Sequence, residues 1–239
     1  MGSYRRSVVV EVANVWESPT SPRPIDGPSV ADRPDPVAWL EALDGVPDGR
    51  LGLHDRLLTQ LVRGEPVEVV EDAVGGWVRV VCPNQPSGRD PKGYPGWVRV
   101  AHLGPFAPPP GRAGGPTPSV SSVVERCRAF GGTAYLWGGT SRFGVDCSGL
   151  VHRVLGDLGV VVPRDAADQQ RALGEVCLAE VRPGDLYFFA REGRPAHHVG
   201  VVTAPMRMVH APETGAVVIE EDVSPQRRAT LVGAARPLP

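Results

Sequence analysis

The sequence predicts an α+β protein in two parts, a small β-barrel followed by a domain of helices packed on an antiparallel sheet. Three observations carry this prediction. Short strand-like segments dominate residues 1–104, a proline- and glycine-rich segment occupies residues 105–118, and helical segments precede a run of strands in residues 119–239. Helices and strands that are segregated along the chain are typical of the α+β class, and 239 residues suffice for two domains.

The first part alternates apolar and polar residues in short runs, the pattern of a half-buried antiparallel sheet. Two runs open with the same Gly-Trp-Val-Arg-Val sequence, and residues 83–95 between them predict a loop. Residues 36–44 and 51–62 are predicted to be helical, as an insertion early in the barrel. Short strands in this number favour a small β-barrel. The predicted strands are residues 8–15, 66–72, 76–82 and 96–103.

The second part begins after residues 105–118, which predict a semi-rigid linker. Residues 119–130 predict a helix with serines that can cap its start, and a glycine-rich loop then leads to a second helix at Cys147. Four strand-like segments follow, separated by turn residues. They are residues 184–190, 198–203, 206–211 and 216–222.

The charge and hydropathy of the chain exclude several classes of function. A formal net charge of −2 provides no basic surface, so no nucleic-acid partner is expected. No apolar run reaches the roughly 7–15 residues of a secretory signal or the roughly 18 of a membrane span. The sequence therefore predicts a cytoplasmic protein with no membrane partner, and it leaves the oligomeric state open.

The four cysteines, at positions 82, 127, 147 and 177, form no Cys-x-x-Cys pair. A zinc knuckle is therefore not predicted, and a zinc site built from Cys147, Cys177 and the histidines would fit no common ligand spacing. We expect no metal and no cofactor. In the cytoplasm all four would be reduced thiols, and three of them are interpreted as packing residues.

Cys147 differs from the other cysteines because it lies where a glycine-rich loop turns into an amphipathic helix. Backbone N–H groups at a helix start stabilise a thiolate and can face a developing oxyanion. Asp146 or a neighbour is available to cap this helix. The apolar stripe of the helix is predicted to consist of Leu150, Val151, Val154 and Leu158.

A nucleophilic cysteine also needs a base from another element. His198 opens one predicted strand and His210 ends the next, so antiparallel pairing would bring the two side by side. His198 would then accept the thiol proton while His210 orients its ring. His197 is assigned to the opposite face. On the residues alone, a structural cysteine and solvated histidines remain an equally open interpretation.

The segments YLWGG, DCSGLV, PRDAADQ, RPGDLYFF, HHVGVV and MVHA, taken in order, resemble the NlpC-type cysteine peptidases of the bacterial cell wall, a papain-like family. The resemblance covers about residues 119–239 and implies the papain-like fold. It implies that Cys147 is the nucleophile, His198 the base and His210 the third, orienting member. It also implies that Tyr135 lies beside the cysteine, where its hydroxyl can stabilise the oxyanion.

The N-terminal half resembles a bacterial SH3-like domain. The whole arrangement resembles the cytoplasmic γ-D-glutamyl-L-diamino acid endopeptidases that recycle murein peptides and act as dipeptidyl-peptidases. This resemblance implies that Asp165 pairs with the free α-amine of the substrate, that Ser148 assists, and that Tyr94 closes the pocket. Asp165 is alternatively a helix cap, and Tyr94 an exposed aromatic residue in a turn.

The sequence departs from this subgroup at two positions. Leu58 stands where an acidic residue is expected, and Ala166 stands where a serine often follows the aspartate. Both departures reduce the polar contacts expected for an amine pocket. They put its affinity and the identity of the first substrate residue in doubt, and they leave the cysteine and histidines untouched.

Three functions follow from these observations. The first is hydrolysis of the γ-D-glutamyl bond to a diamino acid in free murein peptides, with lysine and meso-diaminopimelate both open. The second is a general peptidoglycan endopeptidase, which would need export. The third is a non-catalytic wall-binding protein, which would have no use for Cys147, His198 and His210 together.

Overall fold

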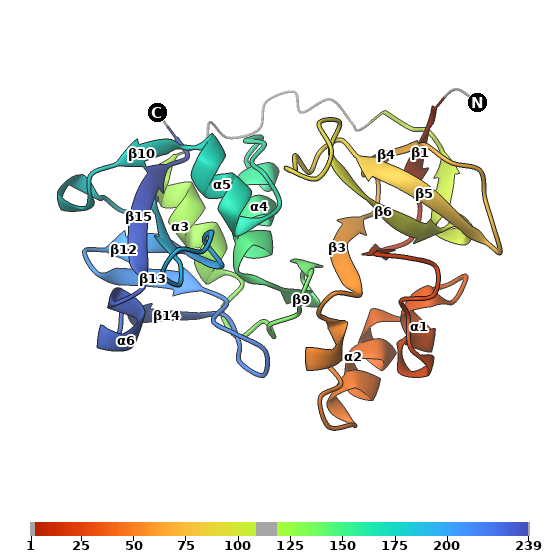
Figure 1. Ribbon diagram of the computed structural model, residues 1–239, viewed down its shortest axis with the longest axis horizontal. Coiled ribbons are helices and arrows are strands. Elements are labelled where there is room, and N and C mark those ends of the chain that lie inside the picture. The colour runs from red at the N-terminus through yellow and green to blue at the C-terminus, as the bar shows by residue number, and fades with distance from the viewer. Residues whose placement is uncertain (1–2, 109–118, 239) are drawn as a thin grey trace. The chain divides into compact units, whose positions relative to one another are not determined.

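The computed structural model describes residues 3–108 and 119–238 and divides the chain into two compact units (Figure 1). Of the described residues, the first unit holds 3–108 together with 136–143, and the second holds 119–135 and 144–238. Residues 109–118, most of the predicted linker, lie outside the described residues. The sequence assigned residues 136–143 to the second domain, whereas the structure packs this segment into the first unit.

The first unit is built on a seven-stranded antiparallel sheet with the strand order β3-β2-β6-β5-β4-β1-β7. Its buried side chains are mostly valines, whose branched side chains suit a pleated sheet. The SH3-like barrel stays a prediction. The strands are β1 (Tyr4–Val8), β2 (Val12–Trp16), β3 (Leu57–Val62), β4 (Pro66–Val69), β5 (Trp77–Cys82), β6 (Tyr94–Arg99) and β7 (Leu103–Pro105), with the 3-10 turn η3 (Val100–His102) before β7.

A helical insertion lies between β2 and β3. It contains η1 (Pro24–Asp26), α1 (Gly27–Val30), α2 (Pro36–Asp44) and η2 (Leu51–Leu53). The prediction of a helix at residues 36–44 is confirmed, because Asp35 accepts hydrogen bonds from the N–H groups of Val37 and Ala38 and proline occupies the first helical position. A second apolar core joins this insertion to the sheet. It contains Trp16, Trp39, Leu43, Leu53, Leu57, Trp77 and Leu136.

Three predictions for the first unit are wrong in detail. Residues 57–62 form β3, not a helix: the i, i+4 spacing of Leu57 and Leu61 suggested a helix, but pairing with β2 decides the conformation. Residues 8–15 are not one strand, because β1 ends at Val8 and β2 begins at Val12. The predicted loop at 83–95 ends early, since β6 already begins at Tyr94.

The second unit has a six-stranded antiparallel sheet in the order β10-β15-β11-β12-β13-β14, and helices α3 and α4 pack against β12. Figure 1 shows α3, α4 and α5 beside this sheet. The strands are β9 (Gly144–Val145), β10 (Gly174–Val176), β11 (Leu186–Phe189), β12 (His198–Ala204), β13 (Arg207–His210), β14 (Ile219–Asp222) and β15 (Leu231–Arg236). The helices are α3 (Val120–Arg128), α4 (Cys147–Asp157), α5 (Ala166–Ala172), η4 (Leu178–Glu180) and α6 (Pro225–Arg228).

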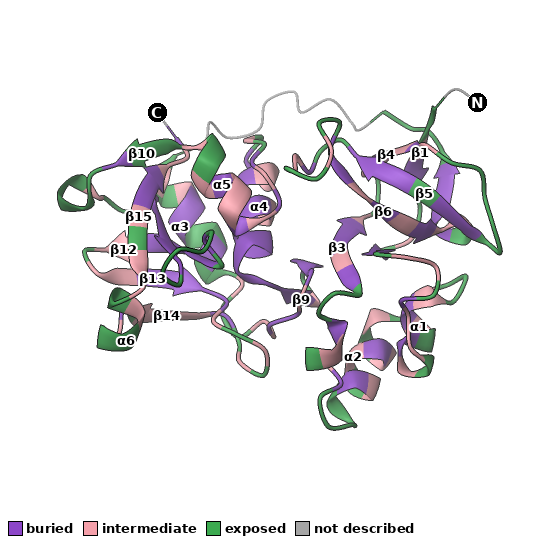
Figure 2. Cartoon of the chain, in the orientation of Figure 1, coloured by how far each residue is buried: buried purple, intermediate pink, exposed green. Residues whose placement is uncertain are grey.

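The order of helices before strands in the second unit is confirmed, and so are the four predicted strands, as β11 to β14. Strand β15 was missed although it pairs with both β10 and β11. Its sequence, LVGAAR, has small residues and no alternation of large apolar with polar side chains. Most of α4 is buried, as its colour in Figure 2 shows, and this includes the predicted stripe from Leu150 to Leu158.

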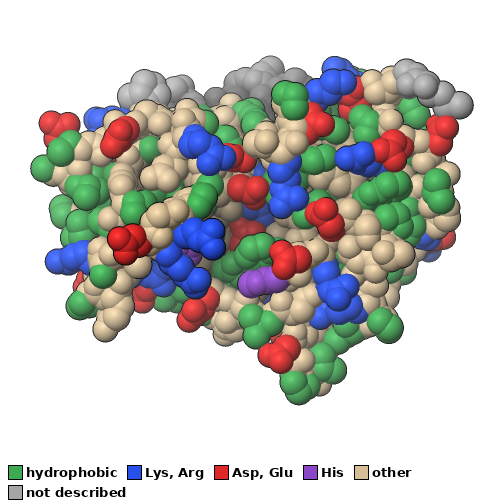
Figure 3. Space-filling view, in the orientation of Figure 1, with side chains coloured by type: hydrophobic (Ala, Val, Ile, Leu, Met, Phe, Trp, Pro, Cys, Tyr) green, Lys and Arg blue, Asp and Glu red, His purple; other side chains and the backbone are tan. Residues whose placement is uncertain are grey.

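The surface carries both signs of charge. On the face drawn in Figure 3, basic and acidic side chains are interspersed, and neither sign covers a large continuous area. This agrees with the formal net charge of −2. Among residues 3–108 and 119–238, no helix is both long enough and apolar enough to span a bilayer.

Candidate active site

Cys147 is the first residue of α4, as predicted. Asp146 is its N-cap: the backbone there is extended, and the carboxylate accepts a hydrogen bond from the N–H of Gly149 at 2.6 Å. This bond satisfies one of the donors that a helix start leaves unpaired. The capping aspartate and the buried stripe of α4 together fix where the thiol points.

The thiol of Cys147 lies against the first residues of β12. Its Sγ–H donates to the backbone oxygen of His197 over 3.9 Å, and the backbone N–H groups of Val199 and Ser148 donate to the sulfur. His198 stands between two residues whose backbones contact the sulfur. Cys147 and the strand that carries His198 belong to the same unit, and the pairing of the thiol with the His198 ring stays a prediction.

The protonation state of Cys147 differs from the thiolate that the sequence suggested. Burial, first, and the negative charge of Asp146, second, raise the pKa of Cys147 to about 12. The two backbone N–H groups and the charge of Arg164 act in the opposite direction but are outweighed. Desolvation disfavours the charged form of any buried acid. The Cys147 thiol is therefore neutral at neutral pH, and it would need a base to take its proton before it could act as a nucleophile.

His198 and His210 are hydrogen-bonded to each other, with His198 Nε2 2.8 Å from His210 Nδ1. The pairing of β12 with β13 places His210 opposite Gly200, on the same face as His198 two residues away. A side chain at Gly200 would lie 3.2 Å from the Cβ of His210 and 2.5 Å from the sulfur of Met208. A glycine inside a strand often marks such a close approach, and here it leaves room for the two rings.

Both histidines are neutral at neutral pH. Burial, first, and then the positive charge that His210 acquires in acid and the charge of Arg227 lower the pKa of His198 well below its usual range. Burial and Arg227 lower the pKa of His210 to about 4, against an opposing effect of Glu221. A neutral imidazole beside a neutral thiol can accept its proton. His197 is exposed, in agreement with its assignment to the other face.

Tyr135 is buried in the same unit, and its backbone N–H donates to the oxygen of Ala216 at 2.8 Å. Burial, followed by the charges of Cys147 and Asp146, raises the pKa of its hydroxyl. The phenol is therefore neutral and keeps a proton that it can donate to an oxyanion.

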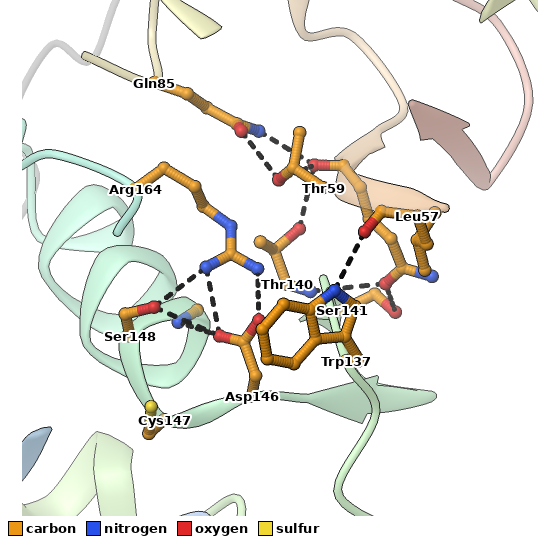
Figure 4. Close-up of polar contacts among 12 residues, drawn as sticks. Leu57, Thr59, Gln85, Trp137, Thr140, Ser141, Asp146, Cys147, Ser148 and Arg164 are labelled. Carbon is orange, nitrogen blue, oxygen red and sulfur yellow. Dashed lines mark hydrogen bonds and ion pairs between the residues drawn. The ribbon is translucent and has the colours of Figure 1, made fainter. Parts of the chain in front are cut away.

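Arg164 was missed by the sequence analysis, although it is almost fully buried. Figure 4 shows its guanidinium facing Asp146 and Ser148. Its Nη2 and Nη1 atoms lie 2.6 Å and 3.0 Å from the two carboxylate oxygens of Asp146, and Nη1 also donates to Ser148 Oγ at 3.0 Å. The sequence feature that could have indicated a buried role for Arg164 is its position between the apolar run at residues 160–163 and an aspartate. Arg164 holds both neighbours of the nucleophile.

Asp165 follows Arg164 and occupies the N-cap position of α5, but its side chain makes no capping hydrogen bond. The alternative interpretation of Asp165 as a capping residue is therefore wrong. Gln169 on α5 donates to the backbone oxygens of Ser148 and Pro163, which holds this segment against the start of α4. Asp165 is half-buried and adjoins Arg164 in the chain, and the Arg164 side chain contacts both Asp146 and Ser148.

Ser148 Oγ donates to Asp146 over 3.3 Å while it accepts from Arg164. A hydroxyl has two acceptor lone pairs, so one remains for another donor.

Tyr94 lies in the other unit, on β6, where it is 2 % exposed and the guanidinium of Arg89 stacks on its ring. The interpretation of Tyr94 as an exposed turn residue is wrong, and its role toward a substrate stays a prediction. Leu58 is partly buried against the core of the same unit.

The remaining cysteines follow the packing interpretation in part. Cys82 and Cys127 are buried, and burial raises the pKa of both thiols. Cys177 is exposed, so the expectation that it packs in the core is wrong. In the part of the chain that the structure describes, no group of three or more histidine, cysteine or acidic side chains is arranged to hold a metal ion.

Comparison with known proteins decides the family. A model of the NlpC/P60 family matches residues 132–236. The gamma-D-glutamyl-L-lysine dipeptidyl-peptidase of Bacillus subtilis is 33% identical over 87% of this chain and 90% of its own length. This chain belongs to the NlpC/P60 family. A gamma-D-glutamyl-L-lysine dipeptidyl-peptidase of Bacillus cereus is 28% identical over 85% of the chain and 81% of the relative.

The three-dimensional comparison agrees. The crystal structure of an NlpC/P60 family protein from Bacillus cereus matches with a TM-score of 0.89 and 26% identity, over 99% of this chain and 100% of the other. The predicted family and its mixed α/β fold are thus confirmed. As an NlpC/P60 cysteine peptidase, the chain is a hydrolase of peptidoglycan peptides.

Proposed function

We propose that this NlpC/P60 peptidase hydrolyses the γ-D-glutamyl–diamino acid bond of murein peptides with a free N-terminal L-alanine, releasing L-Ala-D-Glu in cell-wall peptide recycling. One observation carries the proposal: the similarity to the Bacillus subtilis gamma-D-glutamyl-L-lysine dipeptidyl-peptidase extends over 87% of the chain, well beyond residues 132–236 that match the NlpC/P60 family model. A match limited to the catalytic part would support only a general peptidase. The cytoplasmic location is part of this proposal.

Acylation starts from the neutral pair of Cys147 and His198. The sulfur forms a bond to the γ-carbonyl carbon of D-glutamate while His198 takes the thiol proton. The carbonyl oxygen becomes an oxyanion, which the first N–H groups of α4 and the Tyr135 hydroxyl can stabilise. When the carbon–nitrogen bond breaks, the imidazolium of His198 returns the proton to the leaving amine of the diamino acid.

Deacylation uses the same residues again, with water in place of the thiol as the proton donor to His198. A water molecule gives one proton to His198 as its oxygen attacks the thioester carbon. The carbon–sulfur bond breaks, the proton returns to the thiolate of Cys147, and the dipeptide leaves as a carboxylic acid. His198 must therefore be able to accept a proton at the start of each half-reaction.

Recognition of the free amine is assigned to Asp165, with Ser148 in support. Asp165 is half-buried, and the segment that carries it is tied to both neighbours of Cys147 through Arg164 and Gln169. The remaining lone pair of Ser148 suits an ammonium donor. A carboxylate that faces an ammonium in a desolvated pocket rejects a substrate without that charge, because the carboxylate is then left unpaired.

The test is mass spectrometry of the products from L-Ala-γ-D-Glu-L-Lys, from the corresponding meso-diaminopimelate peptide, and from N-acetylated copies of both. We expect L-Ala-D-Glu and the free diamino acid from the unblocked peptides, and slow cleavage of the acetylated ones. The Cys147→Ala variant is the control for contaminating hydrolases. Equal cleavage of free and acetylated peptides would contradict the proposal and favour a general peptidoglycan endopeptidase.

A further inference from the structure

Glu221, on β14, contacts His210 on the side away from His198, and nothing in the sequence analysis pointed to it. Its carboxylate oxygen lies 3.0 Å from His210 Nε2. The pairing of β13 with β14 places Glu221 opposite Met208 and thus on the face of the sheet that carries His210. The three side chains form one line of hydrogen bonds, from Glu221 through His210 to His198.

The charges along this line determine where its protons lie. An ionised carboxylate only accepts hydrogen bonds, so His210 must carry a proton on Nε2. Because burial and Arg227 lower the pKa of His210 to about 4, its ring is neutral at neutral pH and holds a single proton. His210 Nδ1 is therefore an acceptor.

The hydrogen bond between the two rings then determines which nitrogen of His198 carries the proton. His210 Nδ1 accepts, so His198 Nε2 must be the donor across the 2.8 Å contact. The pKa of His198 is lowered well below its usual range by burial and by the charges of His210, Arg227 and His197, so this ring is also neutral. Its one proton sits on Nε2, and Nδ1 carries the lone pair that a general base needs.

We propose that Glu221 is a positioning residue that fixes the tautomers of His210 and His198 and so keeps His198 in the form that can accept the proton of Cys147. The proposal rests on the role assigned to His198 under the proposed function. Without a pure acceptor at position 221, the opposite pair of tautomers becomes accessible, and it places a proton on the nitrogen that should act as the base.

Glu220 provides a matched control on the same strand. It is opposite Val209 and so belongs to the other face of the sheet, where it pairs with Arg128 and Arg207. A general effect of removing a carboxylate from β14 would appear in both variants. An effect through the histidines would appear only at Glu221.

The experiment compares wild type, Glu221→Gln, Glu221→Ala and Glu220→Gln. Glutamine is isosteric, but its amide can also donate to His210 Nε2 and so permits the opposite tautomers. The tautomers of uniformly ¹⁵N-labelled protein are read at pH 7.5 from long-range ¹H–¹⁵N correlations, with assignments from the single histidine variants. The alkylation rate of Cys147 by iodoacetamide and kcat/KM on the unblocked murein peptide are measured in parallel.

We expect the Nε2–H tautomer for His198 and His210 in wild type and in Glu220→Gln, and a mixture in Glu221→Gln. A mixture reduces the competent fraction, so alkylation and kcat/KM should fall by roughly 2–10-fold in Glu221→Gln and Glu221→Ala. Unchanged tautomers and rates in Glu221→Gln would overturn the proposal, as would an Nδ1–H tautomer of His198 in wild type. If tautomers and alkylation respond but no murein peptide is cleaved, Glu221 keeps its role and the proposed function fails instead.

Discussion

At the scale of single residues, the buried thiol of Cys147 and the buried ring of His198 are both held in their neutral forms. The pKa of the thiol is raised to about 12 and that of the imidazole is lowered, chiefly because burial penalises either charge. The proton must therefore move during the attack on the substrate. In the proposed mechanism, activity therefore depends on the acceptor nitrogen of His198 more than it would in an enzyme with a stable thiolate.

Replacing His198 by alanine should reduce kcat/KM on the murein peptide about as much as Cys147→Ala, because nucleophile and base act as a unit. His197→Ala is the matched control: its side chain is exposed, and only its backbone oxygen contacts the thiol. The kcat/KM of this variant should stay within roughly 3-fold of the wild-type value, because a typical surface substitution changes the free energy by no more than about 0.5 kcal/mol. An essential His197 and a dispensable His198 would reverse the assignment of the base.

Asp165→Asn removes the charge that is assigned to the substrate amine and keeps the size of the side chain. Charge-assisted hydrogen bonds contribute about 1.5–3 kcal/mol, so kcat/KM on the free peptide should fall on the order of 10–100-fold. Cleavage of the N-acetylated peptide should change little. The decisive quantity is the ratio of the two specificity constants, which should approach one in the variant; an unchanged ratio would remove Asp165 from the amine site.

At the scale of elements, the start of α4 depends on the segment that leads into α5. The buried pair of Arg164 and Asp146, 2.6 Å apart, joins the two, and the side chain of Gln169 adds hydrogen bonds to Ser148 and Pro163. Two buried charges are tolerated only because each compensates the other. The position of Cys147 is therefore fixed in part by the segment that leads into α5.

Arg164→Met should destabilise the protein by about 3–5 kcal/mol, because Asp146 is left as a buried, uncompensated charge. The unopposed carboxylate should also shift the pH at which Cys147 is alkylated upward. Arg171→Met on α5 is the control, since Arg171 pairs with Asp168 at the surface and should cost less than about 1 kcal/mol. Urea unfolding measures both, and adding Asp146→Asn should recover part of the loss.

A second dependence between elements involves residues 136–143, which leave the second unit after Tyr135 and pack in the first. Gln60, on β3, accepts hydrogen bonds at its side-chain oxygen from the Thr140 N–H and the Ser141 hydroxyl, and its amide donates to Asn14. Trp137 donates to the backbone oxygen of Leu57 and stacks on His54. These contacts are the physical reason why the segment belongs to the first unit.

Gln60→Ala should therefore cost about 3 kcal/mol of unfolding free energy, because it leaves buried groups of Asn14, Thr140 and Ser141 without partners. The matched control is Gln226→Ala on α6, an exposed glutamine, which should change stability by less than about 0.5 kcal/mol. Equal urea midpoints for the two variants would show that the polar contacts of Gln60 do not hold the segment.

At the scale of the whole molecule, buried histidines make the fold sensitive to acid. The pKa of His152 is lowered to about 4, first by burial and then by the charge of Arg164, and that of His210 is lowered to a similar value. An unfolded histidine titrates near 6.5. Between about pH 6.5 and 4 the unfolded chain therefore binds more protons than the folded one, so the unfolding free energy falls as the pH falls through this window.

His152→Asn tests this dependence, because the asparagine amide can replace the ring nitrogen that contacts the backbone oxygen of Val162. The loss of unfolding free energy between pH 7.5 and 4.5 should be smaller in the variant, by up to about 3 kcal/mol. Urea titrations at the two pH values measure it, and His54→Asn serves as the control at a ring that stacks on Trp137. Identical losses in wild type and His152→Asn would show that His152 does not contribute to acid unfolding.

The sequence by itself determined the α+β class, the helix at Cys147 with its capping aspartate, and the adjacent strands that carry His198 and His210. These features depend on local patterns: a cap next to an apolar stripe, and alternation in strands joined by a short turn. Such patterns act over a few residues and are visible in a single chain. The same locality explains the prediction of a helix at residues 51–62, where the leucine spacing suits a helix and only the partner strand decides otherwise.

Only the tertiary structure decided the partners that lie far apart in sequence. Glu221 beyond His210, Arg164 beside Asp146, and Gln60 with Thr140 are pairs of polar side chains that no local pattern connects. It also decided the protonation states, since a helix start favours the thiolate of Cys147, yet burial outweighs it. Burial and long-range pairing are properties of the folded chain, because a residue's distance from water depends on every element packed around it.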